Sequence, residues 1–132
     1  MPTDLLILVL PAVFAASLWI TNVVGVNIHL PDTVDAFAGP YDNAVLPRWV
    51  QRANRAHLNL LDQAMPFALV VVAGHMAGTT GAMTLWSGWM FLALRLVHAV
   101  GMTTGWLGNP GRPVVFTLGW LCCLAVAGDA VF

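Results

Sequence analysis

Polar residues repeat along one face of a segment that is otherwise apolar. Arg52, Arg55, Asn59 and Asp62 are spaced three and four residues apart, which places them on one stripe of a helix. A carboxylate two turns inside an apolar helix costs several kcal/mol unless it is paired, and an apolar residue would pack equally well. The stripe therefore indicates either internal charge pairing or a polar binding site.

A second polar pair lies further along the chain, in another apolar segment. Arg95 falls about 13 residues into this segment, which is roughly 20 Å along a helix axis. An arginine at that depth is either a structural partner for Asp62 or part of a polar site, and the two roles are compatible. His98 lies one turn beyond Arg95 and should share its surroundings, whereas His75 has no polar company and is predicted to be structural.

Arg112 stands apart from both groups, between Gly111 and Pro113, at the start of the last apolar segment. It can serve as an anchor at the membrane edge. It can also form an anion site, because a guanidinium beside the free amides of a helix start suits a carboxylate or a thiolate. The residues that surround Arg112 in the folded protein decide whether it is an anchor or an anion site.

The composition predicts a membrane protein. Of the 132 residues, 59% are hydrophobic and only 8% are charged, far from the balance of a soluble domain. All five cations are arginines and all six anions are aspartates, so the lysine and glutamate that usually cover solvated helix faces are missing. The formal charge of −1 lacks the basic field that nucleic-acid binding requires, so we expect no nucleic-acid partner. The lipid bilayer is the predicted surrounding.

Several apolar segments are long enough to cross a bilayer, whose hydrocarbon core needs about 20 residues per helix. They cover residues 4–26, 48–77, 82–104 and 114–131. The proline-rich stretch 27–47, the turn 78–81 and the glycine-rich loop 105–113 separate them. We therefore expect an all-α, integral membrane four-helix bundle that forms a single domain over residues 1–132.

The arginines also predict how the bundle is oriented. Four of the five fall at one end of the predicted helices, and both chain termini fall at the other end. By the positive-inside rule, we expect the arginines in the cytoplasm and both termini outside it.

The two cysteines are adjacent in an apolar run, at positions 122 and 123. Neighbouring cysteines have a poor geometry for pairing with each other and do not show the spacing of metal ligands. Cys122 and Cys123 are therefore predicted to be small apolar fillers, and no metal site is expected.

A string in the second segment resembles the second-helix motif of the MAPEG family, the membrane-associated proteins of eicosanoid and glutathione metabolism: RANRAHLNLLDQAMPF, residues 52–67. The motif has an arginine, Arg-Ala three residues later, an asparagine, an acidic residue three further on, and Pro-Phe. The likeness continues with Arg95-Leu96-Val97-His98, similar to an Arg-x-x-His of that family, and with Arg112. Together these pieces cover roughly residues 48–125.

This resemblance implies a homotrimer of four-helix protomers in which glutathione, the co-substrate, binds between neighbouring protomers. The implied glutathione-binding residues are Arg52, Arg55, Asn59, Asp62, Arg95 and His98. The implied catalytic residue is Arg112, which would stabilise the thiolate, because a free thiol has a pKa of about 8.5 and a fixed guanidinium lowers it. The implied function is that of a glutathione transferase or peroxidase acting on lipophilic electrophiles from the bilayer. The implied location is a bacterial inner membrane.

A non-catalytic role is the alternative interpretation of the same sequence. Leu58 stands where a MAPEG relative carries an arginine that binds glutathione, and Met102 and Phe116 stand where it carries tyrosines. The six tryptophans could contact other membrane proteins, although tryptophan more often marks the membrane interface. The alternative is a MAPEG-like membrane subunit or scaffold of a larger membrane complex.

Overall fold

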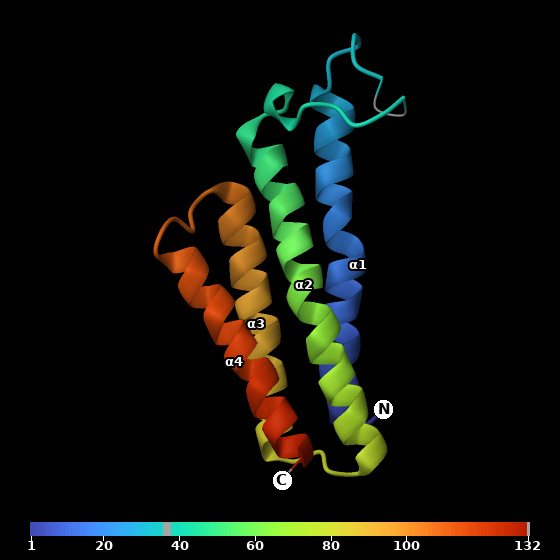
Figure 1. The fold of residues 1–132 in the computed structure, drawn as a ribbon, viewed down its shortest axis with the longest axis vertical. Coiled ribbons are helices and arrows are strands. Elements are labelled where there is room, and N and C mark those ends of the chain that lie inside the picture. Colours follow the sequence, from blue (N-terminus) through green and yellow to red (C-terminus); the bar gives the residue numbers. More distant parts are fainter. Residues whose placement is uncertain (36–37, 132) are drawn as a thin grey trace.

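Long helices form an antiparallel bundle in the computed structural model, which describes residues 1–35 and 38–131 (Figure 1). The elements in these residues are α1 (Thr3–His29), a short 3-10 helix η1 (Asn43–Val45), α2 (Arg48–Ala77), α3 (Ala82–Thr104) and α4 (Gly111–Val131). The four α-helices are all long and apolar enough to span a membrane. The chain is therefore an all-α integral membrane protein, as its composition predicts.

The boundaries of α2 and α3 are as predicted, whereas α1 is longer than predicted. It continues past the expected end at residue 26 to His29. Leu30 ends the helix because it precedes Pro31, and a residue before a proline disfavours the helical conformation.

The start of α4 also differs from the prediction. The helix begins at Gly111 rather than at residue 114. Pro113 fits in the first turn because an N–H group there would have no partner within the helix. Arg112 consequently belongs to the first turn of α4 instead of the loop before it.

The helices carry different charges at the two ends of the bundle. Both termini lie at one end, which we call the aspartate end because it holds Asp4 and Asp129 (Figure 1). The opposite end, where α2 and α4 begin, is called the arginine end and holds Arg48, Arg52, Arg55 and Arg112. At the arginine end, the first turns of α2 extend past the loop that joins α3 to α4 (Figure 1).

Side-chain hydrogen bonds join the helices at the aspartate end. Asp4 Oδ2 lies 2.6 Å from His75 Nδ1 and accepts a hydrogen bond from Thr80 Oγ1 at 3.1 Å. Asp129 Oδ2 accepts hydrogen bonds from the backbone N–H groups of Gly81 and Thr84 and from Thr84 Oγ1, and so caps α3 from α4. His75 therefore has a polar partner from α1 that its own segment of sequence does not reveal.

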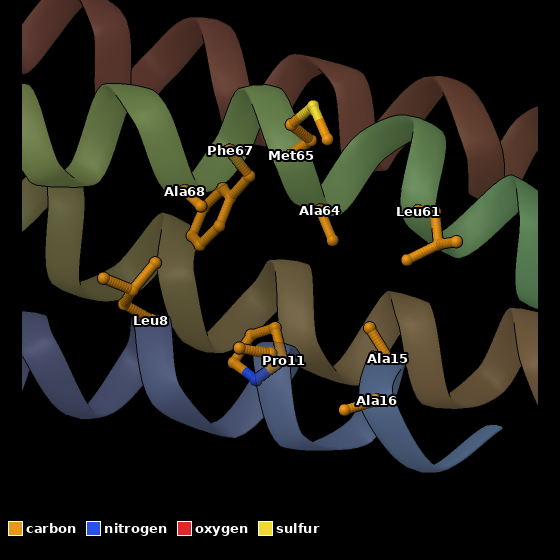
Figure 2. Close-up of a pocket in the computed structure, with 10 residues that line it drawn as sticks. Leu8, Pro11, Ala15, Ala16, Leu61, Ala64, Met65, Phe67 and Ala68 are labelled. Atoms are coloured by element: carbon orange, nitrogen blue, oxygen red, sulfur yellow. The ribbon is translucent and has the colours of Figure 1, made fainter. Parts of the chain in front are cut away.

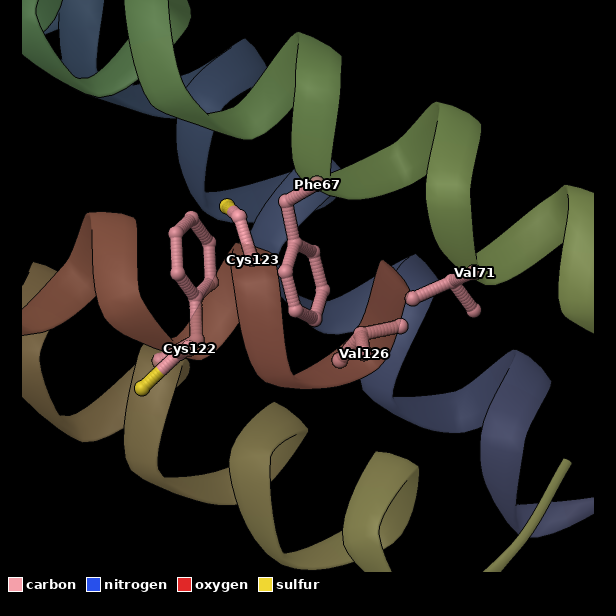
Figure 3. Packing of buried hydrophobic residues seen from close by; sticks show 6 residues of the cluster. Phe67, Val71, Cys122, Cys123 and Val126 are labelled. Carbon is pink, nitrogen blue, oxygen red and sulfur yellow. The ribbon is translucent and has the colours of Figure 1, made fainter. Parts of the chain in front are cut away.

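The apolar core joins α2, α3 and α4. The rings of Phe67 and Phe91 stack with their centroids 4.1 Å apart. Cys122 and Cys123 are free thiols that pack in the same cluster, as expected of apolar fillers (Figure 3).

A separate cavity of about 340 Å³ lies between α1 and α2 (Figure 2). Its walls are apolar and mostly small, with Pro11 and Ala15 from α1 facing Leu61 and Ala64 from α2. Without a polar group, this cavity offers space but no chemistry.

Candidate functional site

A polar cavity of about 330 Å³ opens between α2, α3 and α4 on the side of the arginine end. Its volume lies within the range of small-molecule sites, roughly 300–1,000 Å³. The residues that line it are Arg55, Asn59, His98, Met102, Arg112, Pro113, Phe116 and Thr117. The bundle thus brings together four residues that the sequence predicts to be functional, from three different helices: Arg55, Asn59, His98 and Arg112.

Each helix presents its residues to the cavity for a local reason. Arg55 and Asn59 are four residues apart in α2 and therefore share a face. His98 is buried on α3 and contacts the cavity from behind. Arg112 reaches it from the first turn of α4, with its Nη1 atom 4.0 Å from Met102 Sδ.

The polar groups in the lining favour an anionic ligand. Two guanidinium groups stand on different walls, Arg55 on α2 and Arg112 on α4. An amide, an imidazole and the hydroxyl of Thr117 line the same cavity and can orient uncharged polar groups. Guanidinium groups bind carboxylates with paired hydrogen bonds and stabilise a nearby thiolate. The site can therefore hold a small molecule that carries such groups.

Asp62 lies outside this cavity, on an exposed part of α2. It lines a neighbouring cavity of about 310 Å³ between α2 and α4, together with apolar residues such as Pro66 and Trp120. Phe116 lines both cavities, so they adjoin. A polar compartment and a mainly apolar one thus follow each other along the seam between α2 and α4.

Arg95 is also absent from the lining, because it is buried behind it. Its Nη2 atom donates to the backbone carbonyl of Val115 at 2.9 Å, and its guanidinium lies 5.5 Å and 5.6 Å from the ring centroids of Phe91 and Phe116. Among the described residues, Arg95 forms no ion pair with Asp62, and its Nε and Nη1 atoms have no hydrogen-bond partner. The pairing of Arg95 with Asp62 is therefore not formed, since the aspartate points outward.

The model of the MAPEG family matches residues 5–132, nearly the whole chain. The chain belongs to the MAPEG family. A comparison with curated proteins gives no match. Family membership places it among membrane proteins with a general role in glutathione and eicosanoid metabolism, which are generally oligomeric.

Sequence reasoning misses two residues of α2 and α4 that shape the site of this MAPEG protein. Gln63 Nε2 donates to the Phe116 carbonyl at 2.9 Å, one residue beyond the carbonyl that Arg95 holds. Gly119 makes room for both side chains, because a Cβ atom there would lie 2.5 Å from Arg95 Nη2 and 2.6 Å from Gln63 Oε1. Gln63 and Arg95 thus fix the part of α4 that carries Phe116. An amide next to Asp62 in an apolar helix is the sequence signal that points to Gln63.

Arg52 of the MAPEG motif does not line the polar cavity. Its Nε atom donates to the Thr103 carbonyl at 3.3 Å and so links α2 to the end of α3. It lines a cleft of about 250 Å³ that shares Arg55 and Arg112 with the polar cavity. The stripe predicted on α2 is therefore divided among three adjoining spaces.

Proposed function

We propose that this MAPEG protein binds glutathione in the polar cavity and activates its thiol for reaction with a lipophilic electrophile. The observation that carries the proposal is one cavity lined from three helices by two guanidinium groups, an amide and an imidazole. Glutathione has two carboxylates, two amides, an ammonium group and a thiol, so this set of donors fits it. Asp62, one helical turn beyond Asn59, is the nearby carboxylate on α2 that suits the ammonium group.

Arg112 is the residue we assign to thiol activation. It stands in the first turn of α4, where the helix dipole adds positive potential to its own charge. This potential favours the thiolate over the thiol, and the proton leaves to water at the arginine end. The thiolate sulfur then forms a bond to the electrophilic atom of the substrate, whose leaving group departs or whose ring opens.

The adjoining cavity supports a lipophilic second substrate. It is lined mainly by apolar side chains, among them Pro66, Trp120 and Leu124. Because Phe116 belongs to both linings, an apolar molecule held there lies next to the glutathione cavity. Such a molecule partitions into the bilayer rather than into water.

The exposed carboxylate of Asp62 supports assembly of the protomer into a homotrimer. Asp62 is 14 residues into α2, roughly 20 Å along the helix. A carboxylate that faces hydrocarbon carries a free-energy cost, so we propose that a neighbouring protomer covers this face. Native mass spectrometry of the detergent-solubilised protein should show three chains, and a monomer as the main species would contradict the assembly.

We also propose that the arginine end faces the cytoplasm.

The test of the function is the ultraviolet absorbance of the thiolate when glutathione is added to the purified protein. Wild-type protein should produce the signal, and Arg112→Ala should reduce it at least tenfold at equal glutathione concentration, equivalent to about 1.4 kcal/mol. Thr33→Asp is the matched control, because it lowers the net charge by the same unit in an exposed loop that does not line the cavity. No signal in the wild type, or equal signals in Arg112→Ala and Thr33→Asp, would contradict the proposal.

A non-catalytic role as a subunit of a larger membrane complex is the second candidate. Met102 and Phe116 favour it, because they wall the polar cavity with apolar groups where the family resemblance leads one to expect tyrosine hydroxyls. Copurification with a stoichiometric membrane protein, together with no thiolate signal, would support this role over catalysis.

A further inference from the structure

The arginine end carries a cleft that the proposed glutathione site does not use in full. The cleft measures about 250 Å³ and is lined by Arg48, Gln51, Arg52, Arg55 and Arg112. Four of the five cations of the chain therefore border one space. Arg48, Gln51 and Arg52 do not line the polar cavity, so this part of the cleft needs another explanation.

Helix length places the cleft at the level of lipid headgroups. α2 has 30 residues and is about 45 Å long at 1.5 Å per residue. The hydrocarbon core of a bilayer is only about 30 Å thick. The polar first turns of α2 are the part that exceeds it, and Figure 1 shows them extending past the loop between α3 and α4. Arg48 and Arg52 therefore stand beside the phosphate layer.

The positive charge of the cleft is concentrated where helices usually place acidic residues. The first turns of α2 and α4 contain no acid, and each contains an arginine, Arg48 and Arg112. Both arginines add to the positive ends of the helix dipoles. Among the aspartates of the preceding loop, Asp42 caps η1, and Asp32 and Asp35 line a separate cavity at the end of α1. An anion from outside the protein can compensate the positive charge of this cleft.

Two side chains of the cleft are already fixed in place. Arg52 is held by its bond to Thr103, and its guanidinium packs against Gly105, where a Cβ atom would lie 3.0 Å from Arg52 Cζ. Gln51 Nε2 donates to the Leu46 carbonyl at 2.8 Å. Because these groups are ordered before a ligand arrives, binding costs less conformational entropy.

We propose that this cleft binds a phosphate-bearing anion, and that its occupant in the membrane is the headgroup of an anionic phospholipid. Guanidinium groups bind phosphate oxygens in paired hydrogen bonds, which matches a cleft with several arginines. The cleft lies at the level of the headgroups, where lipid phosphates are available to it. A free phosphate has the same chemistry, so the experiment must separate the two sources.

The experiment titrates the protein in a non-ionic detergent with three probes: short-chain phosphatidylglycerol, short-chain phosphatidylcholine and inorganic phosphate. The readouts are the thermal unfolding midpoint and the lipid adducts retained in native mass spectrometry. Phosphatidylglycerol should bind the wild type more tightly than either other probe. Arg48→Gln should weaken that binding about five- to tenfold, as expected for loss of one arginine at an anionic surface. Thr33→Asp, with the same change in net charge, should weaken it less than about twofold.

The outcomes separate the possibilities. Equal binding of phosphatidylglycerol and phosphatidylcholine to the wild type, or equal losses in Arg48→Gln and Thr33→Asp, would overturn the site. Inorganic phosphate that binds as tightly as phosphatidylglycerol would overturn the lipid headgroup as the occupant. The thiolate measurement on the wild type needs no phospholipid, so failure of the glutathione proposal is visible independently of this one.

Discussion

The aspartate end and the arginine end of the bundle place their charges in different surroundings. Asp4 and Asp129 each accept several hydrogen bonds from other helices or turns of the same protomer. Arg55 and Arg112 instead line open cavities. Charges satisfied within the protomer stabilise the fold, whereas charges that face a cavity are available to a ligand. Substitutions at the two ends should therefore affect different measurements.

The largest effect is expected at Gly119 of α4, where the absence of a side chain leaves room for the buried side chains of Arg95 and Gln63. Gly119→Ala should lower the free energy of unfolding by about 2 kcal/mol, because displacing the buried ends of the Arg95 and Gln63 side chains outweighs the higher helix propensity of alanine. It should also weaken glutathione binding, since α4 shifts. Gly128→Ala on the same helix meets no atom within 4 Å and should be neutral or stabilising by up to about 1 kcal/mol. Unfolding in mixed detergent micelles measures both, and equal effects would contradict the role of Gly119.

At the aspartate end, Asp129→Ala should lower the free energy of unfolding by about 2 kcal/mol. The substitution removes the cap of α3 and leaves the buried hydroxyl of Thr84 without its acceptor. Glutathione binding by the folded protein should stay within about twofold of wild type, because Asp129 lies near the end of α4, far along the helix from Arg112 in its first turn. Asp32→Ala, in the exposed loop, is the control and should change stability by less than about 0.5 kcal/mol. A loss of glutathione affinity in Asp129→Ala would contradict the claim that the charges at the aspartate end serve the fold and not the ligand.

At the arginine end, Asn59→Leu should show the opposite pattern. Glutathione affinity should fall about tenfold, since one hydrogen-bonding partner of the ligand is lost. Stability should change by less than about 0.5 kcal/mol, because the side chain is only half-buried and lines a cavity. Asn54→Leu is the matched control on the same helix, outside the cavity lining. Isothermal titration of both variants with glutathione should therefore separate them, and equal affinities would remove Asn59 from the site.

The smallest effect is expected at His75, whose side chain is 39% exposed beside Asp4. His75→Ala should lower the free energy of unfolding by about 1 kcal/mol, through loss of a hydrogen bond to a carboxylate. His75→Gln keeps a donor and should lose less than half of that. The same unfolding measurement checks both variants, and identical losses would show that the bond to Asp4 contributes nothing.

Much of the fold follows from local features of the sequence. Apolar length predicts each membrane helix, and the turn signals predict the limits of α2 and α3. The starting point of α4 is harder to predict, because Pro113 reads as a loop signal although a proline is well tolerated in a first helical turn. The motif around Arg55 and Asn59 predicts the family from residue types and spacing alone.

The tertiary structure decides which polar residues meet. Asp62 and Gln63 are adjacent, yet Asp62 points outward and Gln63 is buried, because successive residues of a helix face directions about 100° apart and packing against α4 selects one of them. The bonds of Gln63 to Phe116 and of His75 to Asp4 join residues 53 and 71 positions apart. Spacing along one helix cannot reveal such partners. The sequence by itself determined a four-helix membrane protein of the MAPEG family with its charges at selected points; packing among the helices determined which of those charges are satisfied and which face a cavity.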